Sequence, residues 1–246
     1  MINHRAILNV MGSLLLIVTG MLLLSAGVAL FYQEDDLNSF LLTAGITLTV
    51  GLILYFIGRN SNKELNRKDG YIIVSISWIV VSAFAMLPFY ISGYIPSITD
   101  AFFESMSGVT STGCTILDNI EELPHGLLFW RSLTQWIGGL GIIFFTIAVL
   151  PFFGVSGVQL FAAEATGIPH EKVHPRIGVT AKWIWLIYTG MTLLETLLLY
   201  LGDMSLFDSI CHSLSTTSTG GFSTKQDSIA FYTSPDIEYI TTLFLF

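Results

Sequence analysis

The stretch Thr110-Ser111-Thr112-Gly113 interrupts strongly apolar sequence, and Thr217-Ser218-Thr219-Gly220 repeats the same four residues 107 positions later. Small hydroxyl residues beside glycine are typical of non-helical backbone. Each unpaired amide or carbonyl costs several kcal/mol in hydrocarbon, so such backbone is tolerated at membrane depth only where it lines a cavity. The repeat therefore predicts one ion-selective pore built from two matching breaks.

The composition places the chain in a bilayer. Of its 246 residues, 52% are hydrophobic and 11% are charged, which is far more apolar than an ordinary soluble domain. Spanning helices are expected at residues 6–32, 40–57, 71–91, 127–150 and 183–201, with a further helix starting near residue 237. The first run exceeds the 7 to 15 apolar residues of a secretory signal, so it is interpreted as a retained anchor.

Each break follows a short segment, residues 99–109 and residues 207–216. About ten residues make about 15 Å of helix, half the hydrocarbon thickness, which suits a re-entrant pore helix. Asp100 and Asp208 are expected to cap these helices, and they are 108 positions apart. The first copy is therefore interpreted as having one extra residue before its break.

The predicted fold class is an all-α multi-pass membrane protein, with two N-terminal helices followed by repeated helix–pore loop–helix units. Residues 1–69 form the helical hairpin and a cytoplasmic linker, and residues 70–155 form the first unit. Residues 156–182 form a cytoplasmic loop, and residues 183–246 form a second unit whose last helix is truncated.

The distribution of charge predicts a cytoplasmic N-terminus. Eight of the ten basic residues then lie on the inner side, and only Arg131 and Lys225 lie outside, as the positive-inside rule requires. The outer loops are acidic, which would concentrate cations near a pore mouth. For any single acidic residue, a solvated loop charge is an equally good interpretation.

The residue types of the two breaks suit a cation filter. A dehydrating potassium ion needs rings of oxygen atoms, which extended backbone supplies through its carbonyls. Gly113 and Gly220 are expected to take positive φ and let carbonyls turn inward, while the Thr and Ser hydroxyls add ligands. The C-terminal ends of the short helices carry partial negative charge toward the same cavity.

Four motifs resemble those of TrkH-type potassium uptake proteins, in the Trk/Ktr/HKT superfamily. They are Asp100-Ala-Phe-Phe-Glu-Ser-Met-Ser-Gly-Val-Thr-Ser-Thr-Gly-Cys114, Leu123-Pro-His-Gly-Leu-Leu-Phe-Trp-Arg131, Gln135-Trp-Ile-Gly-Gly-Leu-Gly-Ile142 and Ser218-Thr-Gly-Gly-Phe-Ser-Thr224. The resemblance implies a Trk system in the bacterial inner membrane, with four helix–pore–helix repeats around one path for potassium, the transported ion. It also implies a cytoplasmic TrkA-type nucleotide-binding regulatory subunit. Matching the motifs assigns the selectivity filter to Thr110, Ser111, Thr112, Gly113, Thr217, Ser218, Thr219 and Gly220.

The sequence departs from this family in length, because it holds two units where the family has four. A full ring would then need a second copy of the chain, as in a homodimer, or a complementary C-terminal half. The other expected surroundings are membrane lipid and no nucleic acid. The sequence leaves open channel-like flow versus symport with sodium or protons.

Glu104 is predicted to brace the filter from behind, or else to be a buried carboxyl without effect on selectivity. Arg131 is interpreted as an interfacial anchor or as the partner of a pore-helix carboxylate. Gly138 and Gly139 are interpreted as helix-packing residues that let the pore-helix layer approach. Glu195 is expected within the membrane with no assigned partner.

Two alternative functions stay open at this point. His170, Glu171 and His174 satisfy the H-E-x-x-H pattern of zinc metalloproteases, in which the histidines bind zinc and the glutamate is the general base. The flanking Pro169 and Pro175 argue against a helix there, so no zinc site and no enzymatic activity are expected. The second alternative is a nonconducting half-transporter fragment that merely packs in the membrane.

Overall fold

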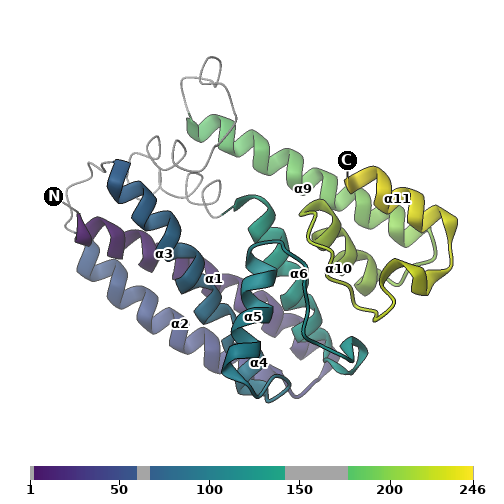
Figure 1. The fold of residues 1–246 in the computed structure, drawn as a ribbon, viewed down its shortest axis with the longest axis horizontal. Coiled ribbons are helices and arrows are strands. Elements are labelled where there is room, and N and C mark those ends of the chain that lie inside the picture. Colours follow the sequence, from purple (N-terminus) through teal and green to yellow (C-terminus); the bar gives the residue numbers. More distant parts are fainter. Residues whose placement is uncertain (1–2, 60–66, 142–176, 246) are drawn as a thin grey trace.

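The computed structural model describes residues 3–59, 67–141 and 177–245, and these residues are helical apart from turns and loops (Figure 1). Within these residues, four helical stretches are long and apolar enough to cross a membrane: His4–Tyr32, Leu37–Gly58, Asp69–Ile91 and Lys182–Leu201. The predicted all-helical membrane fold is confirmed. The end of the helix expected at residues 127–150, and most of the loop expected at residues 156–182, lie outside the described residues.

The N-terminal hairpin consists of α1 (His4–Tyr32) and α2 (Leu37–Gly58), which pack closely along their length (Figure 1). Glycine makes this approach possible. A Cβ at Gly12 would lie 2.7 Å from the Gly51 carbonyl oxygen, and one at Gly58 would lie 2.5 Å from that of Arg5. Small residues of this kind let helix backbones approach each other in lipid, where no hydrophobic force drives association.

The first unit contains α3 (Arg67–Ala85), α4 (Leu87–Ser92), the short helix α5 (Ile98–Val109), a 3-10 turn η1 (Ile120–Glu122) and α6 (His125–Gly139). The second contains α9 (Ile177–Leu201), the short helix α10 (Leu206–Thr217), a 3-10 turn η2 (Ser228–Tyr232) and α11 (Pro235–Leu245). Figure 1 shows α5 and α10 on either side of α6.

The two short helices begin in the same way. Ser97 and Ser205 are the N-caps, and their hydroxyls accept hydrogen bonds from the amides of Asp100 and Asp208 at 3.4 and 3.1 Å. The prediction that the aspartates themselves cap the helices is wrong. They lie in the first turn, where a carboxylate interacts favourably with the helix dipole.

Helix α6, the last described helix of the first unit, also packs on the second unit and hydrogen-bonds to the first long helix of each. The Trp130 indole donates to the Ala85 carbonyl of α3 at 2.9 Å, and the Trp136 indole donates to Thr192 of α9 at 3.0 Å. Tyr188 of α9 donates in return to the Trp136 carbonyl at 3.0 Å. These hydrogen bonds hold α6 in place, and both short helices end against α6.

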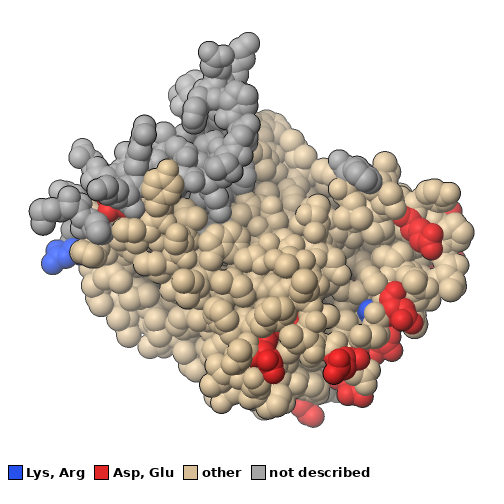
Figure 2. Space-filling model, in the orientation of Figure 1, with Lys and Arg blue, Asp and Glu red and all other residues tan. Residues whose placement is uncertain are grey.

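Charge is segregated at the surface. Figure 2 shows most of the acidic side chains along the edge that carries the loops leading into α5, α6, α10 and α11, with one basic patch among them, and a basic group near an acidic one at the opposite edge by the N-terminus. The orientation predicted from the sequence likewise has most acidic residues on the outer side and most basic residues on the N-terminal side.

The loop between α1 and α2 is anchored on α6 by carboxylates. Glu34 accepts a hydrogen bond from the His125 amide at 2.6 Å and pairs with the His125 ring at 2.7 Å. Asp36 is buried beside Gly126. Burial and the neighbouring Glu34 raise the pKa of the Asp36 carboxyl to about 6, while the Leu127 amide and His125 act in the opposite direction.

Replacing Asp36 by Asn should therefore stabilise the protein at neutral pH. The native carboxyl holds its proton to higher pH than the unfolded one, so ionisation costs stability as pH rises from about 4 to about 6, and the cost stays constant above that. We expect Asp36→Asn to have no effect near pH 4 and to gain up to about 3 kcal/mol above pH 6. Thermal unfolding in detergent at several pH values measures this gain.

The matched control is Asp35→Asn, because Asp35 is exposed in the same loop. It should change stability by less than about 0.5 kcal/mol at every pH. A gain for Asp36→Asn that is equal at pH 4 and pH 7 would contradict the assignment.

Candidate functional site

The first break starts where α5 ends. Ser111 has φ 53° and Gly113 has φ 79°, so the chain leaves the helix through two left-handed residues. The Thr112 amide reaches back to the Ser107 carbonyl at 2.9 Å, which closes the end of the helix. The segment is non-helical, as predicted, and Thr110 and Thr112 are exposed.

The second break has the same backbone conformation as the first, at residues 108 positions later in the chain. Thr219 has φ 54° and Gly221 has φ 87°, and the Gly220 amide donates to the Ser215 carbonyl at 2.9 Å. The prediction that Gly220 takes positive φ is therefore wrong, since Gly221 does so. The extra residue inferred for the first copy is also absent. The four-residue sequence repeat has a spacing of 107 positions, whereas residues with matching backbone conformation are 108 positions apart.

With this spacing of 108 positions, one predicted filter residue, Thr217, belongs to the short helix and not to the break. Thr217 is the last residue of α10 and corresponds to Val109, whereas Ser218 corresponds to Thr110. The Thr217 hydroxyl donates to the Ser213 carbonyl at 2.7 Å and lies 3.1 Å from a carboxylate oxygen of the buried Glu195. The predicted set Ser218, Thr219 and Gly220 lies in the non-helical segment.

The two breaks lie against each other. A Cβ added at Gly113 would overlap the Gly220 carbonyl oxygen, and its positive φ would also strain any other residue. A Cβ at Gly220 would overlap the Gln135 side chain of α6. Both glycines are therefore required by close packing, and the structure brings the two predicted filter segments together.

The small residues of α6 pack directly behind the breaks. A Cβ at Gly138 would overlap the Val109 carbonyl oxygen at the end of α5, and a Cβ at Gly139 would lie 2.6 Å from the Ser218 Cβ. The interpretation of Gly138 and Gly139 as packing residues against the pore-helix layer is confirmed.

Gln135 of α6 joins the two breaks, although its sequence context gave it no role. Its backbone carbonyl accepts a hydrogen bond from the Ser111 hydroxyl at 3.2 Å. Its side-chain oxygen accepts from the Ser215 hydroxyl at 2.5 Å and from the Phe222 amide at 3.0 Å. One fully buried residue thus holds the first break and both flanks of the second.

Glu104 and Arg131 form a buried ion pair. The Arg131 Nε lies 2.9 Å from a Glu104 oxygen, and the two side chains are 1% and 0% exposed. Glu104 also accepts from the Thr115 hydroxyl at 2.9 and 3.0 Å and from the Ile116 amide at 3.1 Å. Of the two interpretations of Arg131, the partner of a pore-helix carboxylate is confirmed.

The same arginine reaches the second unit. Its Nη1 donates to the Ser223 carbonyl at 3.1 Å, and its guanidinium lies 4.2 Å from the centre of the Phe222 ring. The ion pair therefore binds the segment after the first break to the segment after the second.

His212 occupies in the second unit the place of Glu104 in the first. The two are 108 positions apart, and each faces the hydroxyl that follows its break, Thr115 for Glu104 and Ser223 for His212, the latter at 3.3 Å. His212 was assigned no role from the sequence. The 108-residue offset between the two short helices is the signal that could have paired it with Glu104.

The H-E-x-x-H motif at His170, Glu171 and His174 lies outside the described residues. Among residues 3–59, 67–141 and 177–245, no group of three or more His, Cys, Asp or Glu side chains is placed to hold a metal ion.

Two short helices, each ending in a non-helical break against one packing helix, within a bundle that has four candidate spans, define a multi-pass membrane protein of repeated units. Residues 37–246 match the model of the TrkH family, described as cation transport protein. The chain belongs to the TrkH family.

Named relatives agree. The chain is 42% identical to the Trk system potassium uptake protein TrkH of Salmonella typhimurium and 41% identical to that of Escherichia coli K12, in each case over 99% of this chain and 51% of the relative. The crystal structure of the potassium transporter TrkH from Vibrio parahaemolyticus superposes with a TM-score of 0.82 at 38% identity, over 98% of this chain and 48% of that one. The chain thus spans about half the length of these relatives. They are transporters and not enzymes, as expected from the sequence.

Replacing one partner of the buried ion pair should lower the free energy of unfolding more than replacing both partners. Glu104→Gln leaves the Arg131 charge buried and unpaired, so we expect a loss of about 3–5 kcal/mol. The double variant Glu104→Met with Arg131→Met removes both charges and should recover more than half of that loss. Detergent-solubilised thermal unfolding of Glu104→Gln, of Glu104→Met, of Arg131→Met and of the double variant measures the losses and the coupling. Additive losses would contradict a direct pair.

Proposed function

We propose that this chain supplies half of the filter ring of a potassium uptake system. The observation that carries the proposal is the contact between two non-helical segments from matching units, with Gly113 against the Gly220 carbonyl. Thr110, Ser111, Thr112 and Gly113 line one side of the path. Ser218, Thr219 and Gly220 line the other side, joined by Gly221, with Thr217 at the helix end behind them.

The backbone supports this assignment. Left-handed residues in both segments turn successive carbonyls away from the helical direction, and carbonyl rings are what replaces the water of a dehydrating potassium ion. The exposed threonines of both breaks are left uncovered by the described part of the chain. The short helices α5 and α10 end at this point and add their negative dipole ends.

Glu104 is the filter support in this proposal, acting with Arg131, Gln135 and His212. The potassium named for the relatives TrkH of Salmonella typhimurium and Escherichia coli supports potassium as the transported ion here. Since the chain spans half of those relatives, a complementary C-terminal half, or a second copy as in a homodimer, completes the ring. Channel-like flow and symport with sodium or protons fit the geometry equally.

The same proposal places the chain in the bacterial inner membrane with a cytoplasmic N-terminus. Arg5 and Arg59 lie at the ends of α1 and α2 opposite the loop that contains Glu34, Asp35 and Asp36, which supports this orientation. A cytoplasmic TrkA-type regulatory subunit is proposed as the partner, in keeping with the Trk system naming of the relatives.

Transport by glycine variants tests the proposal. In cells that lack potassium uptake, the chain is expressed alone and with a complementary C-terminal half, and rubidium uptake is measured. Gly113→Ala should reduce uptake at least about tenfold, because a Cβ meets the Gly220 carbonyl. Gly45→Ala is the matched control, since a Cβ at Gly45 in α2 meets open space.

His170→Ala should leave uptake unchanged, whereas loss in that variant alone would favour the zinc-site alternative. Equal uptake by Gly113→Ala and Gly45→Ala would contradict the filter assignment. Absence of uptake in every combination would favour the nonconducting fragment.

A further inference from the structure

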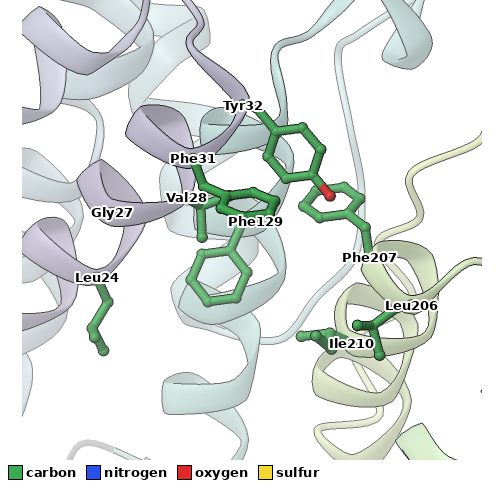
Figure 3. A pocket seen from close by; sticks show the side chains of 9 residues that line it. All are labelled: Leu24, Gly27, Val28, Phe31, Tyr32, Phe129, Leu206, Phe207 and Ile210. Carbon is green, nitrogen blue, oxygen red and sulfur yellow. The ribbon is translucent and has the colours of Figure 1, made fainter.

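An apolar groove runs between α1, α6 and α10, away from the breaks. It encloses about 330 Å³ and is lined by Gly27 and Phe31 of α1, Phe129 of α6, and Phe207 and Ile210 of α10, among others. Figure 3 shows the α1 side chains on one side, the α10 side chains on the other, and Phe129 between them. The groove lies along α1, a candidate membrane span, at a depth where acyl chains are available to it.

A polar cavity of about 400 Å³ adjoins one end of this groove. The two share Tyr32, Leu206 and Phe207. The cavity lies where α6 and α10 begin, which is the acidic edge of the molecule in Figure 2. Tyr32 stands at the junction, with its ring stacked on His125 at 3.9 Å, as expected of an aromatic residue at a membrane interface.

Charges of both signs line the cavity. Glu121 and Asp208 are the carboxylates, and His125 and Lys225 are the basic residues. The His125 ring is engaged by Glu34 at 2.7 Å. Lys225, whose ammonium lies 4.8 Å from the centre of the Phe231 ring, is the remaining cation for a ligand phosphate, and the surplus of carboxylate opposes a ligand with net negative charge.

We propose that the groove and the cavity together bind one phospholipid whose headgroup carries a primary amine. An acyl chain occupies the groove, the phosphate lies at Lys225, and the ammonium donates to Glu121. Asp208, whose two oxygens accept from the Thr224 and Ser205 hydroxyls at 2.6 and 2.8 Å, contributes its negative charge. This occupant matches the order of the surfaces, apolar at membrane depth and zwitterionic at the interface. Phosphatidylcholine, with its quaternary amine, lacks the N–H donors, and phosphatidylglycerol lacks the positive charge.

The groove is tested by filling it. Gly27 lines the groove and a Cβ there meets open space, so Gly27→Phe adds a ring at the groove wall. Gly20→Phe is the matched control, because Gly20 lies in the same helix, its Cβ also meets open space, and it does not line the groove. The purified chain is titrated with phosphatidylethanolamine in detergent, and the one-to-one adduct is counted by native mass spectrometry.

We expect Gly27→Phe to weaken the adduct at least tenfold and Gly20→Phe to leave it within twofold. Melting temperatures of both variants show whether they fold. Equal adducts in the two folded variants would overturn the proposal. So would a loss of chain dimers in Gly27→Phe with lipid binding unchanged, since the occupant would then be a second copy.

The headgroup is tested by competition and by two charge variants. Phosphatidylethanolamine should bind at least fivefold more tightly than phosphatidylcholine and at least tenfold more tightly than phosphatidylglycerol. Lys225→Gln should weaken both zwitterionic lipids, and Glu121→Gln should erase the preference between them. Tighter binding of phosphatidylglycerol, or no response to either variant, would overturn the headgroup assignment. None of these measurements depends on transport.

Discussion

The buried pair of Glu104 and Arg131 is the constraint on which the arrangement of the two breaks depends. Each charge loses its hydration, which costs several kcal/mol, and a single contact at 2.9 Å does not offset that loss. The remaining oxygen and nitrogen atoms must therefore also find partners. They find them at Thr115, Ile116 and Ser223, all in segments that follow a break, so satisfying the charges fixes those segments in place.

Helix α6 supplies the other half of the constraint. Gly138 and Gly139 admit the ends of both short helices, and Gln135 satisfies polar groups from both units. With Arg131 these residues lie on one helix, which therefore serves as a common scaffold for two repeats. The repeats are equivalent in backbone yet differ in chemistry behind the break, because Glu104 and His212 share one place and a single arginine is shared between them.

The sequence predicted the long helices and the existence of both breaks, because length, hydropathy and glycine beside hydroxyl residues are local signals. It did not predict the register. Thr217 matches Thr110 as a letter, but backbone conformation follows the serine caps and the left-handed residues, which repeat at 108 positions. The bonds of Gln135 and of Arg131 join positions up to 92 residues apart, and no periodicity in one sequence marks such pairs. Arg131 was limited to two interpretations only because its charge lay in an apolar helix.

The two sides of the breaks are unequal, and this inequality bears on the proposed function. Behind them, α6 and the ion pair hold the backbone with buried hydrogen bonds. In front, Thr110, Thr112 and Thr219 are exposed. Oxygen atoms held by a rigid rear side need little reorganisation when an ion exchanges its hydration shell for them, and preorganised dipoles are worth more in a site of low dielectric. A filter made from such segments depends less on the hydroxyl groups in front than on the satisfaction of the charges behind.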